Sequence, residues 1–244
     1  MEEKKISSAV IKRLPRYYRY LSELLEKGID RISSHELSKK MNVTASQIRQ
    51  DFNNFGGFGQ QGYGYNVSYL HDEIGKILGL EHNYNVIIIG AGNLGRALAN
   101  YGGFTKRGFQ MAGIFDVDKE KIGKKINDIP VYSIEDIEVF VKEHPVHIAA
   151  LTVPKDQASK IAGRLAEVGV EAFWNFASTD LKVPSHVVVE NVHLAESLMR
   201  LSYRLSEKDK EKERGGAYAK RKQRPIAAIA AAGAWEKTSH PCLG

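Results

Sequence analysis

The stretch from Tyr84 to Asn100, YNVIIIGAGNLGRALAN, constrains the fold more than any other part of the chain. An apolar, β-branched run enters a glycine turn, GAGNLG, and residues with helical apolar spacing follow it. The pattern predicts a strand, a tight turn and a helix. In such a motif one glycine permits the turn, one lets a pyrophosphate approach the backbone, and one lets the helix pack on the strand. Because a helix N-terminus favours phosphate, we predict a dinucleotide-binding motif.

The identity of the dinucleotide follows from a carboxylate. A second apolar run, Met111 to Phe115, ends at Asp116, about 20 residues beyond the last glycine of the turn, where dinucleotide-binding proteins carry an acidic residue. A carboxylate there accepts hydrogen bonds from a ribose 2′-OH and repels a 2′-phosphate. The sequence therefore predicts NAD or NADH rather than NADP(H); a glycine turn that binds nothing is the alternative.

The stretch from residue 84 to 192 alternates strands and helices, which is typical of a parallel, Rossmann-like α/β sheet. Strands are expected at 147–153, 171–177 and 186–192, and a ligand should lie beyond their carboxyl ends, near the residues that follow them. Ordinary packing is the alternative for each of these residues. The predicted cofactor-binding residues are Gly90, Ala91, Gly92, Asn93, Leu94, Gly95, Asp116, Thr152, Val153, Pro154, Asn175 and Phe176.

The N-terminal region has the pattern of a helix-turn-helix. A helix is expected over 7–27, and two short helices follow, each announced by a capping box, at Ser33–Glu36 and Thr44–Gln47. The second helix, over 45–54, exposes polar side chains that can read base edges in a major groove. Arginines of the first helix can contact phosphates or form a solvated face. The predicted DNA-binding residues of these helices are Arg13, Arg16, Ser46, Gln47, Arg49 and Gln50.

A glycine- and aromatic-rich segment, residues 55–65, follows directly. Glycines supply the backbone conformations of a tight hairpin, and the aromatic residues supply strands to brace it. A hairpin after a recognition helix is the wing of a winged helix, so Gln60 and Gln61 near its tip are further predicted DNA contacts. The alternative is a purely structural flap. A helix from Tyr69 to Leu78, capped by Ser68, is expected to complete this domain.

The C-terminal part consists of an apolar helix and a charged tail. Leucines recur at near-heptad spacing from His193 to Ser206, so this helix needs a surface to cover and a homodimer is expected. Residues 209–244 carry eight Lys and Arg against four Asp and Glu and are expected to be a disordered basic tail. The predicted domains are a winged helix over 1–82, a dinucleotide-binding domain over 83–192, a dimerisation helix over 193–208 and the tail.

Composition narrows the class of protein. The net charge is +6, but most of it lies in the tail, so charge alone does not indicate DNA binding. One cysteine, Cys242, provides neither a disulfide framework nor a thiolate metal site, and no metal is expected. No secretory segment and no apolar run of membrane-spanning length is found, which predicts a cytoplasmic protein without membrane partners.

No catalytic constellation stands out, so no catalytic residue is predicted. A winged helix joined to a dinucleotide fold without obvious catalytic groups favours a redox-responsive DNA-binding protein. One alternative is an NAD(H)-dependent oxidoreductase with an accessory helical domain, which predicts turnover of a carbonyl or alcohol. The other is an NAD-binding module whose helical domain binds protein, which predicts no salt-sensitive DNA binding.

Five motifs in order resemble the Rex family of bacterial redox-sensing transcriptional repressors, over roughly residues 4–208. They are SQIRQDFNNFGGFGQQGYGY, IIIGAGNLGRAL, FDVD, LTVP and NFA. The resemblance implies a homodimer with exchanged C-terminal helices that binds a palindromic operator when NAD⁺ dominates and releases it when NADH binds. The dinucleotide is then an effector and not a redox co-substrate.

The resemblance also implies an interdomain switch. In the family an arginine, matching Arg19, connects to a tyrosine, matching Tyr101, and to an acidic residue at the start of the last helix. His193 stands at that acidic position, so this linkage departs from the family. The wing tip departs too, because family members often have a basic residue where Gln60 or Gln61 stands. The effector preference is expected to come from an apolar nicotinamide pocket near Phe176 and Val153, where the charged NAD⁺ ring costs more to desolvate.

Overall fold

The glycine turn lies at the centre of a seven-stranded sheet with the strand order β10-β9-β8-β4-β5-β7-β6. All neighbouring strands are parallel except the β6–β7 hairpin. The computed structural model describes residues 6–53, 59–60 and 63–222. The strands are β4 (Tyr84–Ile89), β5 (Phe109–Asp116), β6 (Lys125–Ile126), β7 (Ile129–Ser133), β8 (Ile148–Leu151), β9 (Ala172–Asn175) and β10 (Val188–Asn191).

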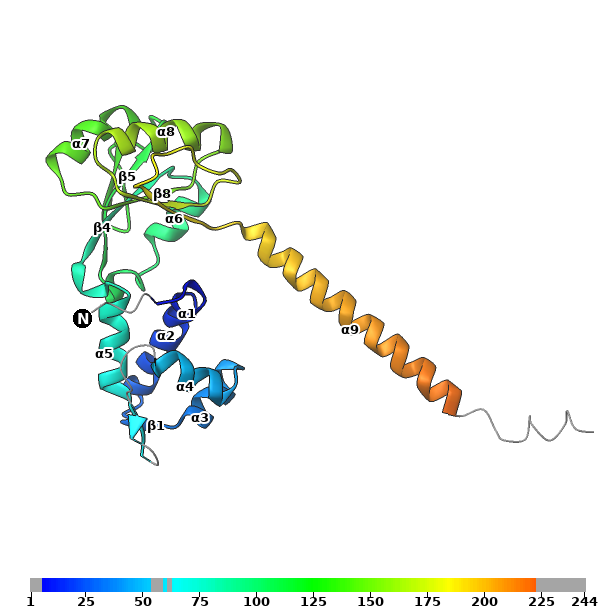
Figure 1. The fold of residues 1–244 in the computed structure, drawn as a ribbon. Helices are drawn as coiled ribbons and strands as arrows, with labels where there is room; N and C mark the ends of the chain where they lie inside the picture. The colour runs from blue at the N-terminus through cyan, green and yellow to red at the C-terminus, as the bar shows by residue number, and fades with distance from the viewer. Residues whose placement is uncertain (1–5, 54–58, 61–62, 223–244) are drawn as a thin grey trace, which may run out of the picture. The chain divides into compact units, whose positions relative to one another are not determined.

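Helices cover both faces of this sheet (Figure 1). Alternate residues of β4 point to opposite faces, so Ile87 and Ile89 pack under α7 (Ile137–Glu143) and α8 (Lys155–Glu167). Val86 and Ile88 face the other side, where α6 (Asn93–Ala99) lies. This explains why β4 reads as a continuous apolar run. Short 3₁₀ turns, η1 (Leu80–His82), η2 (Thr105–Arg107) and η3 (Ile134–Asp136), complete the connections.

The buried side of α6 is the side of its glycine. Gly95 and Ala99 are buried and Leu98 is half-buried, whereas Ala97 is exposed.

The N-terminal region has a separate apolar core, built from residues between Val10 and Ile74. Its helices and strands are α1 (Ser8–Ile11), α2 (Leu14–Glu26), β1 (Arg31–Ile32), α3 (Ser34–Met41), α4 (Ala45–Asn53), β2 (Gly59–Gln60), β3 (Gly64–Asn66) and α5 (Val67–Ile77). The strands pair antiparallel in the order β1-β3-β2, so the expected hairpin follows α4. A helix-turn-helix with a wing is the result, as the sequence predicts.

Capping explains most of these helix boundaries. Ser33 and Glu36 form the predicted capping box at the start of α3. Asn42 adopts a left-handed conformation, with φ of 53°, and ends that helix. At α4 only half of the second box forms, because Thr44 Oγ1 accepts the Gln47 N–H while the Gln47 amide reaches Asp51 instead of the cap. Both short helices therefore begin where their hydroxyl caps stand.

Two expected boundaries in the N-terminal region are wrong. The single helix expected over 7–27 is divided into α1 and α2, because Pro15 stands in the first turn of α2, where its missing N–H cannot continue a preceding helix. The helix expected from Tyr69 begins at Val67, and its cap is Asn66 rather than Ser68. The Asn66 side chain accepts the Tyr69 N–H at 2.8 Å.

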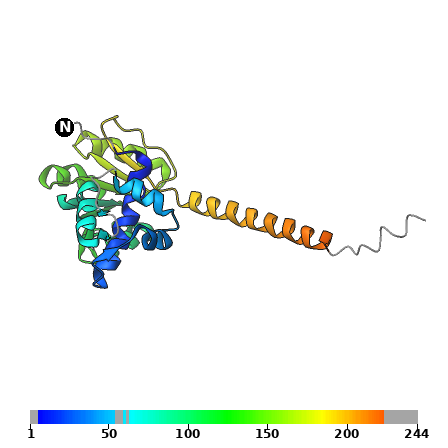
Figure 2. The same ribbon diagram turned by 60° about the horizontal axis from the view of Figure 1, so that its bottom comes forward.

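Residues 1–191 form one unit and residues from Val192 onward form another. The second unit contains α9 (Leu194–Lys222), a single uninterrupted helix (Figure 2). It continues well beyond Ser206, where the change to a charged composition predicted its end, because the residues after it are mostly good helix formers with acidic and basic pairs three apart. Within the described ranges, no helix is long and apolar enough to cross a membrane.

Candidate dinucleotide site and nucleic-acid interface

The backbone of the glycine turn after β4 packs against the end of β5 and against the residue that follows β8. Gly90 has a φ of +102°, and its N–H donates to the Phe115 carbonyl at 2.7 Å. A side chain at Gly95 would collide with the Gly90 carbonyl and lie 2.9 Å from Thr152 Oγ1. Gly92, at the N-terminus of α6, has open space around it. The three glycines therefore serve a turn, a clear approach to the helix N-terminus, and close packing, as the motif predicts.

Asp116 holds the turn from the end of β5. Its carboxylate accepts the Ala91 N–H at 2.6 Å and the Asp118 N–H at 2.8 Å. Lys121 Nζ lies 3.6 Å from the same carboxylate and 3.2 Å from that of Asp118. Asp116 is buried, with 8% of its surface exposed, and still lines the adjacent cavity. The predicted ribose-binding carboxylate is thus also a structural clamp on the turn.

A cavity of about 600 Å³ opens beside the turn, at the carboxyl ends of β4, β5 and β8. Thr152 braces this edge, because its hydroxyl lies 2.9 Å from the carbonyl oxygens of both Ile89 and Gly90. The space, the open Gly92 backbone and the Asp116 carboxylate together fit the adenosine and phosphate half of a dinucleotide. The predicted residues that line the cavity are Gly90, Gly92, Asp116, Thr152, Val153 and Pro154.

Asn175 and Phe176 do not line this cavity. Asn175 is fully buried, and its amide donates to the Thr179 carbonyl and Asn191 Oδ1 while it accepts the Ala177 N–H. Phe176 packs edge-on against Trp174, with ring centroids 4.6 Å apart. Its N–H donates to the Leu151 carbonyl at 3.0 Å, which places its backbone at the carboxyl end of β8. Phe176 and Val153 are therefore near the same edge of the sheet without sharing the cavity.

Sequence reasoning missed several residues of the cavity wall. Val117, with 77% of its surface exposed, follows Asp116 directly, so its position in the chain was the available signal. Gln157 and Asp156 belong to the first turn of α8. Nothing in a single sequence distinguishes such residues from ordinary surface residues.

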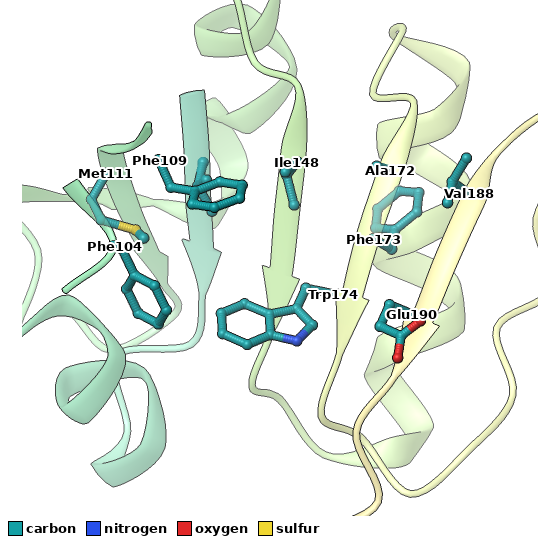
Figure 3. Close-up of a pocket in the computed structure, with 10 residues that line it drawn as sticks. Phe104, Phe109, Met111, Ile148, Ala172, Phe173, Trp174, Val188 and Glu190 are labelled. Atoms are coloured by element: carbon teal, nitrogen blue, oxygen red, sulfur yellow. The ribbon is translucent and has the colours of Figure 1, made fainter. Parts of the chain in front are cut away.

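A second hollow, of about 300 Å³, lies on the α6 face of the sheet and is almost entirely apolar (Figure 3). Trp174 and Phe104 both line it, with their rings perpendicular and the ring centroids 5.5 Å apart, and Glu190 is the charged residue of its described lining. No helix connects β9 and β10 in the described chain. An apolar surface of this kind is typical of a site that another segment covers.

Some of the predicted DNA-contacting residues of the helix-turn-helix are exposed, and one is held in an ion pair. Ser46, Arg49 and Gln50 are exposed on α4, and the Arg49 guanidinium lies 3.3 Å from Ser46 Oγ. Arg13 is instead paired with Asp51 through two hydrogen bonds of 2.7 Å each. A guanidinium held in this way is a structural link between α2 and α4, and so Arg13 is less available to phosphate than the sequence suggested.

Asp51 is the residue of this interface that the sequence analysis overlooked. It is fully buried and also accepts hydrogen bonds from the Tyr17 hydroxyl and the Gln47 amide, both at 2.8 Å. Burial opposes its ionisation, but the hydrogen bonds from Arg13, Tyr17 and Gln47 outweigh burial and hold the pKa of Asp51 below its usual value. Burial and the Asp51 carboxylate raise the pKa of Tyr17. The available signal was an acidic residue one turn after Gln47.

The remaining predicted residues have local partners. Arg16 is exposed near the Tyr20 ring, and Arg19 pairs weakly with Glu23 at 4.0 Å. Tyr101 is 55% exposed and packs on Phe104. His193 precedes α9, and its carbonyl accepts the Glu196 N–H. Gln60 ends β2, and Gln61 lies outside the described residues.

The fold and site define a protein that joins a winged helix-turn-helix to a dinucleotide-binding α/β domain. Comparison with known protein families supports both the DNA-binding N-terminal region and the α/β domain. A family model described as "Putative DNA-binding protein N-terminus" matches residues 5–53, and one described as "CoA binding domain" matches residues 81–179.

Full-length relatives make the assignment specific. The redox-sensing transcriptional repressor Rex of Thermoanaerobacter pseudethanolicus is 57% identical over 216 residues, which cover 88% of this chain and 96% of the relative. Rex of Clostridium perfringens strain SM101 is 56% identical over 210 residues, 86% of this chain and 99% of the relative. The chain belongs to the Rex family of redox-sensing transcriptional repressors.

Solved structures extend the likeness to the fold. The crystal structure of RSP in complex with β-NAD⁺ and operator DNA has a TM-score of 0.79 and 56% identity, and covers 87% of this chain and 98% of its own. RSP in complex with β-NADH has a TM-score of 0.78 and 54% identity, with 85% and 98% covered. RSP is described as a Rex-family repressor.

Proposed function

We propose that this chain is a redox-sensing transcriptional repressor that binds palindromic operator DNA through α4 and the wing and leaves it when NADH replaces NAD⁺. One observation carries the proposal. The chain matches, over 87% of its length, a Rex-family repressor whose structure contains both β-NAD⁺ and operator DNA. The protein is a regulator rather than an enzyme, and NAD(H) is its effector.

The residues of the cavity fit a dinucleotide. The adenosine and phosphates are assigned to the glycine turn and Asp116, and the nicotinamide to the edge formed by Thr152, Val153 and Phe176. A dinucleotide bound there supplies only a difference in affinity between two arrangements of the protein, because a ligand that binds both equally shifts nothing. If replacing Phe176 by alanine leaves the ratio of NADH to NAD⁺ affinity unchanged, the assignment of the nicotinamide to this edge is wrong.

The proposed DNA contacts are Arg16, Ser46, Gln47, Arg49, Gln50, Gln60 and Gln61. The proposed domains are a winged helix over 1–82 and a dinucleotide-binding domain over 83–192, and their separate apolar cores support that division. The dimerisation helix and tail predicted at 193–208 and 209–244 do not divide at residue 208, because α9 continues to Lys222. Because a transcriptional repressor acts where its operator DNA lies, we place the protein in the cytoplasm. The interdomain roles of Arg19, Tyr101 and His193 remain proposals that rest on the family.

The proposed assembly is a homodimer in which α9 of one copy covers the apolar sheet face of the other. Leu194, Leu198 and Leu201 of α9 each expose more than half of their surface. The hollow around Trp174 and Phe104 supplies an apolar surface of the same character. Two copies also match the two-fold symmetry of a palindromic operator.

DNA binding is tested with a fluorescent duplex that carries an inverted repeat of TTGTGA-type half-sites, compared with a scrambled duplex of the same composition at fixed salt. We expect tighter binding to the inverted repeat, and weaker binding to both duplexes as salt rises. Equal affinity for the two duplexes would contradict operator recognition.

A further inference from the structure

The side-chain amide of Gln47 has a fixed orientation. Gln47 is the third residue of α4, and its Nε2 donates to Asp51 Oδ1 at 2.8 Å. N-terminal residues of a recognition helix are those that contact base edges in a helix-turn-helix complex. One side of the amide faces Asp51, and the residue as a whole is half-buried, so part of it remains accessible to solvent.

Asp51 can act only as an acceptor in this position. Both of its oxygens already accept hydrogen bonds from the Arg13 guanidinium, and one also accepts the Tyr17 hydroxyl. The ion pair with Arg13 keeps the carboxylate ionised, and an ionised carboxylate has no proton to donate. The amide atom that faces Asp51 must therefore be nitrogen, and the oxygen must lie on the other side.

The positions of the donor and the acceptor on the side of the Gln47 amide away from Asp51 are therefore fixed. Among the described residues, Oε1 accepts no hydrogen bond, and Nε2 keeps a second N–H. Adenine presents a donor, N6–H, next to an acceptor, N7, in the major groove, whereas guanine presents two acceptors. A phosphate likewise offers only acceptors. An amide with fixed orientation thus matches adenine and repels guanine through its oxygen.

We propose that Gln47 is a base-reading residue for adenine and that Asp51 is a positioning residue, which holds the Gln47 amide in the orientation adenine requires. The inference rests on the proposed function, because it needs α4 to lie in the major groove of the operator. It deepens that function by assigning one base preference to one side chain.

The test measures relative affinities of the full chain for operator duplexes in which each half-site base pair is replaced in turn, at fixed salt. Gln47→Ala is expected to reduce the preference for adenine at one position of each half-site by about five- to 150-fold, as loss of a bidentate base contact does. Preferences at the other positions are expected to stay the same. Asp51→Ala is expected to reduce the adenine preference at that same position, and the double variant to lose no more than Gln47→Ala.

Glu138→Ala provides the matched control, because it removes another carboxylate from an ion pair, with Arg164 at 2.6 Å, in the α/β domain. Its base preferences are expected to equal those of the unchanged chain. A fall in affinity that is uniform across all duplexes reports loss of folded protein, so thermal unfolding of each variant is measured alongside. The ratio between duplexes is the readout for positioning.

Two further measurements need no substitution of the buried Asp51. In the duplex, 7-deazaadenine at the assigned position removes N7; it should weaken binding of the unchanged chain and leave binding of Gln47→Ala unaffected. The NMR signals of the Gln47 side-chain amide are assigned by their absence from the spectrum of Gln47→Ala. One of the two amide protons should have a shifted resonance and be protected from exchange with solvent. An amide that behaves like an exposed glutamine would overturn the positioning role.

The remaining outcomes are distinct. Unchanged adenine preference in Gln47→Ala overturns the base-reading role while operator binding, and hence the proposed function, stands. Loss of preference in Gln47→Ala but not in folded Asp51→Ala overturns the positioning role alone. No binding of the unchanged chain to any duplex at any salt overturns the proposed function and this inference with it.

Discussion

Asp116 both holds the glycine turn and lines the candidate dinucleotide cavity. Its carboxylate fixes the glycine turn through Ala91 and is shielded on one side by Lys121. Because it also lines the cavity, the same negative charge would face the ribose in the proposed binding mode. Discrimination between NADH and NADPH would then depend on a charge whose position is set by the fold of the turn itself.

Replacing Asp116 by asparagine is expected to raise the affinity for NADPH relative to NADH about tenfold, because repulsion between charges about 4 Å apart is worth about 1–4 kcal/mol at surface dielectric values. Binding of both dinucleotides is measured by calorimetry. Asp118→Asn is the control, since Asp118 also pairs with Lys121 but does not line the cavity. An equal change in both variants would contradict the argument.

The glycines of the turn are expected to respond differently to alanine. Gly92→Ala should fold normally, because the space around it is open, and should lose at least about tenfold in NADH affinity because the methyl group occupies the phosphate position. Gly95→Ala should cost about 3 kcal/mol or more of folding free energy through the clash with Gly90.

Gly163 in α8 is the control for both glycine variants, since nothing lies within 4 Å of a side chain there. Its replacement by alanine should stabilise the fold by about 0.5–1 kcal/mol with no effect on NADH. Urea unfolding and NADH fluorescence measure the two effects. Normal NADH binding by Gly92→Ala would show that the phosphates lie elsewhere.

At the level of elements, the sequence predicted what depends on local patterns. The strand before Gly90, the capped helix at Ser33 and the wing after α4 all follow from neighbouring residues. The β6–β7 hairpin was missed although Asn127 and Asp128, both with positive φ, form its turn, because β6 has only two residues. The Arg13–Asp51 pair joins residues 38 apart in the chain, and no periodicity indicates such a contact.

In the candidate site, too, the sequence predicted only the parts that depend on local patterns. The glycine turn and Asp116 have fixed spacing, so both were found. The structural use of Asn175 was not predictable, because one of its three hydrogen bonds goes to Asn191, 16 residues further along the chain, and no periodicity indicates that contact. The length of α9 was underestimated since its charged half has no apolar period to reveal a helix.

The link between α2 and α4 should be sensitive to acid. The folded pKa of Asp51 lies below the unfolded value of about 3.9, so its stabilisation is complete above that pH and is lost as the pH falls through the folded pKa. Asp51→Asn is expected to cost about 3 kcal/mol at pH 7. This difference from the unchanged chain, measured by urea unfolding, should shrink below about pH 4. A difference independent of pH would contradict the ionised pair.

In the whole molecule, two apolar surfaces support the proposed homodimer. The outward leucines of α9 and the hollow around Trp174 are each exposed within a single chain. Burying them against one another in a two-fold arrangement would couple dinucleotide binding in one copy to the placement of the other. In the proposed dimer, operator release would be a change in how two winged helices are spaced, because half-sites sit about one helical turn apart.

Leu198→Glu is expected to shift the protein from a dimer, with a mass near twice 27.2 kDa, toward a monomer, because it places a charge in the apolar stripe of α9. Sedimentation equilibrium at micromolar concentration measures the mass. Arg200→Ala, on another side of α9, should remain dimeric. If Leu198→Glu keeps the mass of the unchanged chain, the dimer does not use this stripe.

Release of a fluorescent operator duplex reports whether the dinucleotide controls operator binding. The full chain is bound to the duplex at fixed salt and titrated separately with NADH and with NAD⁺, and the anisotropy is followed. We expect release by NADH at concentrations at which NAD⁺ releases little. Binding that neither dinucleotide alters, or that both alter equally, would contradict this expectation.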